Sequence, residues 1–304
     1  MILLDDCDKL EREFERLRKI FQLNSNHEGE TMEVVLAEYL GFCYGVKRAI
    51  SIAKAHADGK SCTLGPIIHN PQMVERLKAE GVGVIENLSE MSEGTVIIRS
   101  HGVGPQIYSK IQAKGLKIVD ATCPHVKKAQ LSAKELSESG YSVIIIGEKN
   151  HPEVKSILEW AGGAATVLET EAEAENFAQC KKLGVVSQTT VAEAHFQKIV
   201  ARLLSKSKDI RILRTICTAT EQRQSAAMDL AAKVDVMLVV GGRNSANTTK
   251  LAKICAERCK TYHIETAAEI SPEWFVQSKK VGITAGASTP DWIIREVQIK
   301  CQRM

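Results

Sequence analysis

The segment Lys117-Ile118-Val119-Asp120-Ala121-Thr122-Cys123-Pro124 decides how this chain folds. Its β-branched residues are typical of a strand, and its cysteine is followed at once by a proline. Because proline is favoured in the first turn of a helix, we interpret the segment as a strand that leads directly into a helix. α/β proteins bind ligands where a strand's carboxyl end meets a helix's amino end, and the helix dipole there favours a thiolate.

The same strand–cysteine–helix construction occurs twice more. The run Val34-Val35-Leu36 leads to Cys43 and to a helix predicted over residues 45–57. A strand predicted over residues 210–216 leads to Cys217 and to another predicted helix. Three such cysteines, one in each structural unit, indicate three ligands of one shared centre.

From residue 32 onward, predicted strands and helices alternate, with residues 61–65 expected to form a turn. Each cysteine opens a segment of similar length, which is a weak internal repeat. Alternating strands and helices imply mainly parallel sheets, so we predict an α/β fold of three similar lobes in a pseudo-threefold arrangement around the cysteines. The predicted divisions are an N-terminal amphipathic helical extension and linker (1–31), a strand pairing with the third lobe (32–42), and the first, second and third α/β lobes (43–122, 123–216 and 217–304).

The composition limits the classes of function. The chain has 304 residues, 44% of them hydrophobic, and a formal net charge of +3, which gives no electrostatic footprint for nucleic acid or a membrane surface. No apolar run approaches the ~20 residues of a membrane span, and the N-terminus has neither a signal-peptide nor a transit-peptide pattern. Nine cysteines, odd in number and widely spaced, argue against a disulfide scaffold and for a reducing, cytoplasmic location.

The three repeated cysteines favour an iron–sulfur cluster over zinc. A structural zinc site usually has four protein ligands in closely spaced pairs, and no such spacing occurs around Cys43, Cys123 or Cys217. Three widely separated thiolates suit a [4Fe–4S] cluster with one iron left open to substrate. We therefore predict one such cluster per chain, held by these three cysteines at the centre of the three lobes.

Three histidines occupy equivalent places after predicted strands. His69, His101 and His151 each lie in a turn that contains glycine or asparagine, not on the apolar face of a helix. A single histidine of this kind would be structural more often than functional, but three in equivalent places favour a site for an anion or a substrate. The remaining histidines lack this context and are interpreted as surface residues: His27, His56, His125, His195 and His263.

The third unit carries short polar residues where the other units carry histidine. Ser245, Asn247 and Ser288 follow glycine at predicted helix starts, where hydroxyl, amide and backbone N–H groups are suited to bind phosphate. Ordinary helix capping is the alternative role for both serines. Glu153, two residues after His151, is the one carboxylate within these clusters; proton transfer and a structural charge in a first helical turn are its two possible roles.

Nine short motifs can be considered together, in chain order: Gly41-Phe42-Cys43-Tyr44-Gly45-Val46, Ile68-His69-Asn70, Ser100-His101-Gly102-Val103, Asp120-Ala121-Thr122-Cys123-Pro124, His151-Pro152-Glu153-Val154, Gln188-Thr189-Thr190, Cys217-Thr218-Ala219-Thr220, Asn244-Ser245-Ala246-Asn247 and Thr284-Ala285-Gly286-Ala287-Ser288. In this order they resemble the motifs of the 4-hydroxy-3-methylbut-2-enyl diphosphate reductases, the last enzymes of the methylerythritol phosphate route to isoprenoids. The resemblance runs from about residue 32 to the C-terminus, and no single motif carries it.

The resemblance implies a three-lobed fold with an oxygen-sensitive [4Fe–4S] cluster on the three cysteines. The substrate's allylic hydroxyl would bind the open iron, and two electrons and a proton would expel water to give isopentenyl and dimethylallyl diphosphates. A low-potential donor of the ferredoxin or flavodoxin type would supply the electrons. Glu153 would deliver protons, with Thr189 and His151 as further catalytic residues. The implied substrate-binding residues are His69, His101, His151, Thr189, Ser245, Ala246, Asn247 and Ser288.

Ala246 departs from the pattern of the family, because many relatives carry a second serine there. The sequence leaves two other functions open. One is a non-redox dehydratase of the quinolinate synthase type, which also has three α/β lobes with one cysteine each but would be expected to lack the motifs around Thr189 and Ser245. The other is a non-catalytic iron–sulfur sensor, which would leave Glu153 and Thr189 unexplained. We rank both below the reductase.

Overall fold

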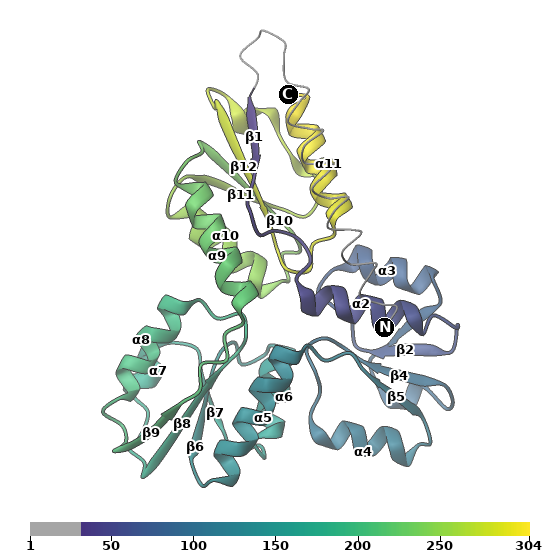
Figure 1. The fold of residues 1–304 in the computed structure, drawn as a ribbon, viewed down its shortest axis with the longest axis vertical. Coiled ribbons are helices and arrows are strands. Elements are labelled where there is room, and N and C mark those ends of the chain that lie inside the picture. The colour runs from purple at the N-terminus through teal and green to yellow at the C-terminus, as the bar shows by residue number, and fades with distance from the viewer. Residues whose placement is uncertain (1–31) are drawn as a thin grey trace, which may run out of the picture. The chain divides into compact units, whose positions relative to one another are not determined.

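A computed structural model describes residues 32–304, and the predicted N-terminal helix and linker over residues 1–31 lie outside the described residues. Within the described range, three four-stranded sheets with flanking helices form three lobes (Figure 1). All strand pairs in these sheets are parallel. The prediction of an α/β fold with three similar lobes and mainly parallel sheets is therefore confirmed.

The first lobe has the strand order β3-β2-β4-β5. Its elements are the strands β2 (Ser61–Leu64), β3 (Val82–Ile85), β4 (Thr95–Ile98) and β5 (Lys117–Asp120) and the helices α2 (Tyr44–Ala55), α3 (Pro71–Ala79) and α4 (Pro105–Ala113), with a short 3₁₀ turn, η1 (Leu88–Glu90). The prediction of a turn over residues 61–65 is wrong, because β2 pairs with both β3 and β4. Two hydroxyl side chains, Ser61 and Thr63, are buried in this strand, so it lacks the apolar pattern that would have revealed it.

The second lobe repeats this arrangement as β7-β6-β8-β9. Its elements are the strands β6 (Ser142–Ile146), β7 (Thr166–Leu168), β8 (Lys182–Ser187) and β9 (Asp209–Ile212) and the helices α5 (Pro124–Glu138), α6 (Pro152–Trp160), α7 (Glu171–Glu175) and α8 (Glu193–Leu203). The strand predicted over residues 210–216 stops at Ile212 because a side chain then replaces the backbone ladder. Thr215 Oγ1 accepts a hydrogen bond from the Ser187 backbone N–H at 2.8 Å and donates one to the Ser187 carbonyl at 2.6 Å.

The third lobe completes its sheet with the first described strand of the chain. The strand order is β1-β12-β10-β11, and β1 (Glu33–Leu36) lies beside β12 with Val34 opposite Val281. The other elements are β10 (Val236–Val240), β11 (Lys260–Ile264), β12 (Lys280–Ala285), α9 (Thr218–Ala231), α10 (Ala246–Ala256) and α11 (Asp291–Gln302), with two 3₁₀ turns, η2 (Ala267–Glu269) and η3 (Pro272–Phe275). β1 thus takes the edge position that β5 and β9 take in the other two sheets.

The helix that follows each cysteine packs on the sheet of the next lobe. In α2, Val46, Ala49 and Ala53 lie on one helical face and pack with Ile97 of the first sheet. Core clusters likewise join α5 to the second sheet and α9 to the third. Each cysteine therefore lies between an edge strand of one sheet and a helix on the next, at a border between two lobes.

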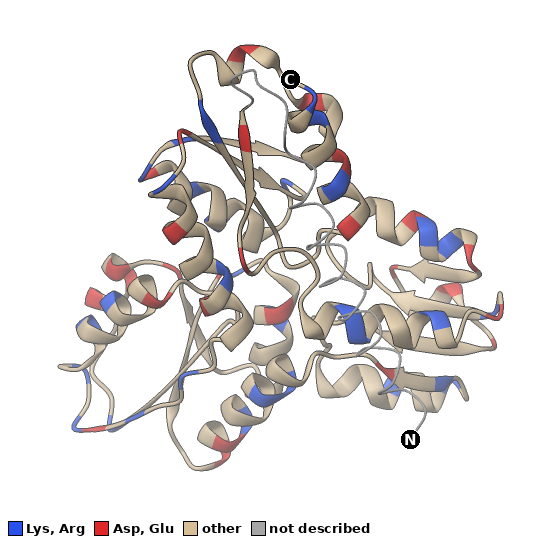
Figure 2. Ribbon diagram, turned by 45° about the horizontal axis from the view of Figure 1, so that its top comes forward, with Lys and Arg blue, Asp and Glu red and all other residues tan. Residues whose placement is uncertain are grey.

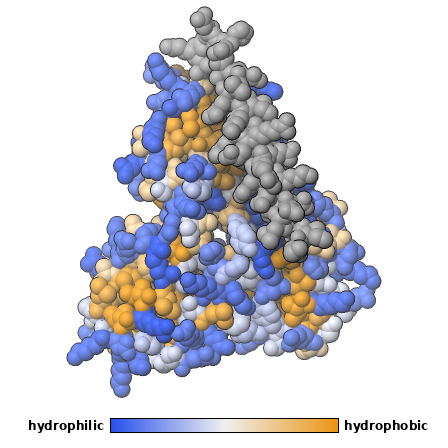
Figure 3. Space-filling view, in the orientation of Figure 1, coloured by the Kyte–Doolittle hydropathy of each residue, from blue (hydrophilic) through white to orange (hydrophobic). Residues whose placement is uncertain are grey.

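Within residues 32–304, none of the helices combines the length and the hydrophobicity needed to span a lipid bilayer. Figure 2 shows basic and acidic residues interspersed on all three lobes, without one lobe carrying a single sign of charge. Hydrophilic residues cover most of the face drawn in Figure 3, with hydrophobic groups exposed between them.

Candidate functional site

One cavity is lined by residues from all three lobes. Every candidate site residue from the sequence contributes to its wall: Cys43, Cys123, Cys217, His69, His101, His151, Glu153, Thr189, Ser245, Ala246, Asn247 and Ser288. The fold brings them together because they follow the carboxyl ends of parallel strands that point to the same place.

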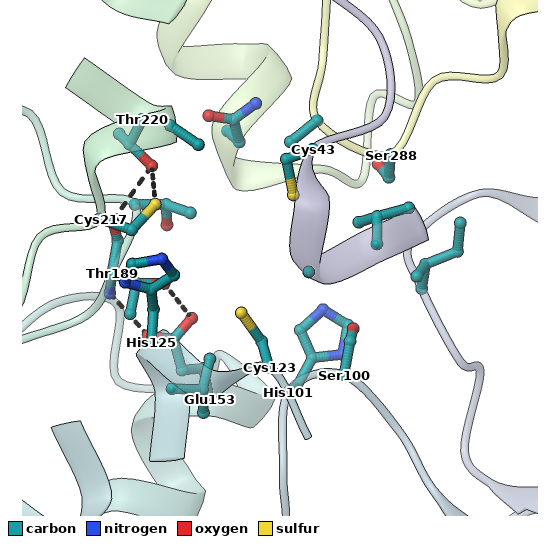
Figure 4. Close-up of a pocket in the computed structure, with 18 of the residues that line it drawn as sticks. Cys43, Ser100, His101, Cys123, His125, Glu153, Thr189, Cys217, Thr220 and Ser288 are labelled. Carbon is teal, nitrogen blue, oxygen red and sulfur yellow. Dashed lines mark hydrogen bonds between the residues drawn. The ribbon is translucent and has the colours of Figure 1, made fainter. Parts of the chain in front are cut away.

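Each of the three cysteines is the N-cap residue of a helix, namely α2, α5 and α9. Figure 4 shows their sulfur atoms directed into the cavity from three different parts of the chain. Burial raises the pKa of Cys123 to about 11 and also raises that of Cys217. At Cys123 and Cys217 burial thus outweighs the helix dipole, and these two thiols would ionise at neutral pH only when a metal centre binds them.

Gly45 keeps the space between the sulfur atoms free. A Cβ atom at this position would lie 2.5 Å from the sulfur of Cys123 and 3.9 Å from that of Cys43. Both sulfur atoms therefore lie close to one point, and a larger residue there would collide with Cys123. Three convergent sulfur donors beside an open space fit a multinuclear iron–sulfur group, whose preferred ligands are thiolates.

The three candidate histidines form one cluster of imidazole rings. The ring centroid of His69 lies 4.3 Å from that of His101 and 5.4 Å from that of His151, and the latter two are 5.6 Å apart. Burial lowers the pKa of all three, to about 4 for His151. The free site therefore presents neutral imidazoles at neutral pH. His151 Nδ1 accepts the Glu153 backbone N–H at 3.1 Å, which leaves the ring proton on Nε2.

Glu153 is 2% exposed and is held by Thr189, from a different element. The Thr189 backbone N–H donates to Oε1 at 2.6 Å, and the Thr189 hydroxyl donates to Oε2 at 3.0 Å. Burial raises the pKa of Glu153 to about 7, although these hydrogen bonds act in the opposite direction. The carboxyl is thus close to half protonated at neutral pH, the state in which a side chain both gives and takes protons.

The third lobe contributes hydroxyl, amide and backbone groups. Ser245 Oγ accepts the Thr248 N–H at 3.4 Å, so this serine caps α10, and Ser288 Oγ donates to the His69 carbonyl at 3.2 Å. Ala246 is the first residue of α10, where N–H groups have no partner within the helix. The side-chain nitrogen of Asn247 is buried and has no hydrogen-bond partner among the described residues.

Further buried polar atoms of the cavity wall also lack a hydrogen-bond partner in the described part of the chain. They are His69 Nε2, His101 Nδ1, Thr190 Oγ1 and Arg223 Nε. Buried polar groups are nearly always hydrogen-bonded, so a group of such atoms around one cavity indicates a polar ligand.

Among the cavity-wall residues that were not identified as candidates from the sequence, two carry basic side chains. Arg223 is buried on α9, and His125, which was interpreted as a surface residue, is exposed but contributes to the wall beside Cys123. A signal for Arg223 was present in its helical spacing, because Thr220, Arg223 and Ala227 follow one another at i, i+3 and i+7. A positive charge on the buried face of a helix is unfavourable unless a negative group lies near it, so this position indicates a functional role.

Thr220 connects a cysteine to the carboxyl site. Its hydroxyl oxygen lies 2.9 Å from the sulfur of Cys217 and donates to the Thr189 carbonyl at 3.1 Å (Figure 4). The Cys217 backbone N–H donates to the same carbonyl at 3.1 Å. The loop that carries Thr189 is thereby fixed to the loop that carries Cys217. Thr220 links the Cys217 sulfur to Thr189, the residue that holds Glu153.

Comparisons with known proteins place the chain among homologues. Residues 34–302 match the family model described as LytB protein. The chain is 50% identical over 269 residues to the 4-hydroxy-3-methylbut-2-enyl diphosphate reductase of Geobacter metallireducens, a match that covers 88% of this chain and 95% of that protein.

Two solved structures have the same fold. One is (E)-4-hydroxy-3-methyl-but-2-enyl diphosphate reductase, described as the terminal enzyme of the non-mevalonate pathway, with 45% identity and a TM-score of 0.68 over 90% of this chain and 100% of that one. The other is the E-1-hydroxy-2-methyl-but-2-enyl-4-diphosphate reductase of Plasmodium falciparum, with 29% identity and a TM-score of 0.84 over 87% of this chain and 86% of that one.

Proposed function

This chain belongs to the LytB protein family, and from that premise we propose that it reduces (E)-4-hydroxy-3-methylbut-2-enyl diphosphate to isopentenyl diphosphate and dimethylallyl diphosphate. The reaction is the last step of the methylerythritol phosphate pathway. Its balance requires two electrons and two protons, because the hydroxyl leaves as water and the allyl group gains a hydrogen. The observation that carries the proposal is the meeting of three thiols, three imidazoles and one buried carboxyl at a single cavity.

The family implies an iron–sulfur cluster, and we assign it as a single [4Fe–4S] cluster held by Cys43, Cys123 and Cys217. Such a cluster supplies electrons and Lewis acidity when it is bound. With three protein ligands for four irons, one iron would be left open to the substrate. The convergence of the three sulfur atoms and the space kept by Gly45 support this assignment.

The diphosphate is assigned to the polar side of the cavity. Neutral imidazoles donate hydrogen bonds through one ring nitrogen, and the buried amide of Asn247 has a donor to spare. The start of α10 adds backbone N–H groups and a favourable helix dipole, which compensates for the missing hydroxyl at Ala246. The groups proposed to bind the diphosphate come from His69, His101, His151, Ser245, Ala246, Asn247 and Ser288.

Glu153 is proposed as the proton donor. A carboxyl with a pKa of about 7 retains a transferable proton at neutral pH, whereas an ordinary glutamate does not. Thr189 orients both carboxyl oxygens of Glu153. The Thr189 hydroxyl is proposed to take part in the proton relay or to orient the substrate hydroxyl. His151 positions Glu153 by accepting its backbone N–H and presents its own Nε2 proton.

A low-potential electron donor of the ferredoxin or flavodoxin type is proposed as the redox partner. A groove on the described surface is lined by Thr122 and Pro124, the two neighbours of Cys123, and by the basic residues Arg48, Lys127 and Lys128. Of the acidic residues there, Asp120 lies 3.7 Å from Lys127. A carrier with acidic side chains would fit this groove. It would then contact Thr122 and Pro124, the residues on either side of the proposed cluster ligand Cys123.

Reversal of one charge tests this docking face. Lys128→Glu is expected to slow reduction by an acidic carrier protein about tenfold at low salt while leaving reduction by a small dye unchanged. Lys198→Glu, a change at another exposed lysine on α8, is the matched control. Equal rates with the carrier for both variants would remove the groove from the proposal.

We place the enzyme in the cytoplasm. All eight cysteines that the structure describes are free thiols, which fits a reducing compartment.

The reaction itself is tested on anaerobically purified protein with a reduced low-potential dye and 4-hydroxy-3-methylbut-2-enyl diphosphate. The expected result is formation of the two five-carbon diphosphates, dependent on both bound iron and reductant. Iron-loaded protein that neither binds the substrate nor forms product would refute the proposed function.

A further inference from the structure

Arg223 is a buried cation without a protein partner. It lies in the middle of α9, is 4% exposed and contributes to the cavity wall. Its Nε has no hydrogen-bond partner, and no ion pair joins its side chain to any residue of the described chain. Most other arginines of the described chain are exposed or partly exposed, and several form ion pairs with carboxylates, as Arg211 does with Glu135 at 2.9 Å.

A buried guanidinium cannot reduce the unfavourable free energy of its buried charge by releasing a proton. The ordinary pKa of arginine is so high that the side chain stays charged even where burial lowers it, as it does here. An unpaired buried charge is strongly unfavourable, so a negative group inside the cavity is required to balance it. The two candidates for that group are the sulfur-bound centre and the diphosphate.

The positions of the charged groups favour the sulfur-bound centre. Burial lowers the pKa of Arg223, and the groups that act in the opposite direction are the sulfur atoms of Cys43 and Cys217. The imidazole cluster is under the influence of different cations, because Arg99 acts on all three histidines and Lys250 acts on His151. Among the residues that line the cavity, Arg223 is thus the cation that acts on the thiols, whereas Arg99 and Lys250, which act on the imidazoles, do not belong to the cavity wall.

We propose that Arg223 is the counter-cation of the iron–sulfur cluster and sets its affinity and its reduction potential. This inference rests on the proposed function, which places the cluster on the three cysteines. Three thiolates bring negative charge into the site, and each added electron brings more. A fixed positive charge beside them stabilises the bound state over the apoprotein and the reduced state over the oxidised one. Arg223 is therefore a positioning and tuning residue that acts through the cluster.

The first measurement is the reduction potential of the loaded enzyme, followed by visible and electron paramagnetic resonance spectra in a dye-mediated titration. Arg223→Met keeps length and removes charge, and it is expected to lower the ratio of reduced to oxidised cluster at a given potential by about tenfold, which is ~59 mV for a one-electron couple. Arg223→Lys keeps the charge and is expected to retain most of the potential. Arg99→Met is the matched control, expected to weaken diphosphate binding without moving the potential.

The second measurement separates tuning from a structural role. In the iron-free protein the unpaired charge of Arg223 is unfavourable, so Arg223→Met is expected to raise the unfolding temperature of the apoprotein. The iron-loaded variant is expected to lose its iron to a chelator faster than the wild-type protein does. A purely structural arginine would instead destabilise both forms when removed.

The outcomes are distinguishable. A wild-type enzyme that is loaded and active, with an unchanged potential in Arg223→Met, overturns this inference and leaves the proposed function intact. An unchanged potential with weakened pyrophosphate binding would assign Arg223 to the diphosphate and overturns it as well. If the wild-type protein binds no cluster, the proposed function and this inference fail together.

Discussion

Thr189 holds both carboxyl oxygens of Glu153, one through its backbone N–H at 2.6 Å and the other through its hydroxyl at 3.0 Å. The two residues are 36 positions apart and follow the ends of two neighbouring strands, β8 and β6. The carboxyl accepts both hydrogen bonds, which together fix the orientation of its two oxygens. The same threonine accepts hydrogen bonds at its carbonyl from the Cys217 backbone and the Thr220 hydroxyl, so the proposed proton donor and one proposed cluster ligand are held by the same residue.

The first prediction concerns the proton of Glu153. Glu153→Gln keeps size and most hydrogen bonding but removes the transferable proton, so kcat should fall by about 10²- to 10⁴-fold while substrate still binds. Steady-state kinetics and binding to the oxidised enzyme would measure the two effects. Glu159→Gln, at the exposed end of the same helix, is the control and should have normal turnover. Near-normal turnover of the Glu153 variant would exclude it from the mechanism.

The second prediction is the pH dependence of turnover. Because burial raises the pKa of Glu153 to about 7, its carboxyl is protonated below that value and ionised above it. Turnover should therefore decline as pH rises through about 7, since the proton donor is lost. The decline should be absent from the residual activity of Glu153→Gln. A wild-type profile that is flat between pH 6 and about 8.5 would contradict this role.

The third prediction is proton uptake when the diphosphate binds. The free imidazoles are neutral because burial lowers the pKa of His69, His101 and His151, and a bound anion would raise these values. Binding should therefore strengthen as pH falls from about 8 to 6, by up to about tenfold per pH unit for each proton taken up. Titration calorimetry in buffers of different ionisation enthalpy would count the protons. His56→Gln, at the end of α2, should leave the count unchanged.

The fourth prediction concerns the cluster ligands. Cys123→Ser should reduce bound iron by at least about tenfold, because a serine hydroxyl is a poor substitute for a thiolate. Iron analysis and the visible spectrum after anaerobic purification would measure the loss. Cys180→Ser, in the second lobe and away from the cavity, should keep its iron. Full iron content in the Cys123 variant would refute its role as a ligand.

The fifth prediction concerns Gly45. In Gly45→Ala the new methyl group would lie 2.5 Å from the sulfur of Cys123, so one of the two must move. Bound iron and turnover should both fall about tenfold, while the circular dichroism spectrum of the protein stays unchanged. Ser51→Ala, on the exposed side of the same helix, is the control. Normal iron loading in Gly45→Ala would show that the space beside Cys123 is not needed.

The sequence alone was sufficient for the α/β class and for three lobes with parallel sheets. The reason is that local patterns carry this information: β-branched runs end at small polar residues, and helices begin directly after them, three times over. The strand β2 was missed because its short polar residues carry no local pattern, and its pairing with two neighbours makes it a strand. The end of β9 at Ile212 likewise depends on a contact between Thr215 and Ser187.

The tertiary structure decided what the candidate side chains do to one another. Residue spacing indicated that Glu153 was of interest, but its pKa of about 7 comes from burial, which depends on the tertiary packing around it. The pairing of Glu153 with Thr189 joins residues far apart in the chain, and no local pattern encodes it. That Arg223 Nε lacks a hydrogen-bond partner among the described residues can be known only from the tertiary structure, because it depends on the positions of all the side chains around it. Local sequence thus determined which elements form, and the convergence of three lobes determined their chemistry.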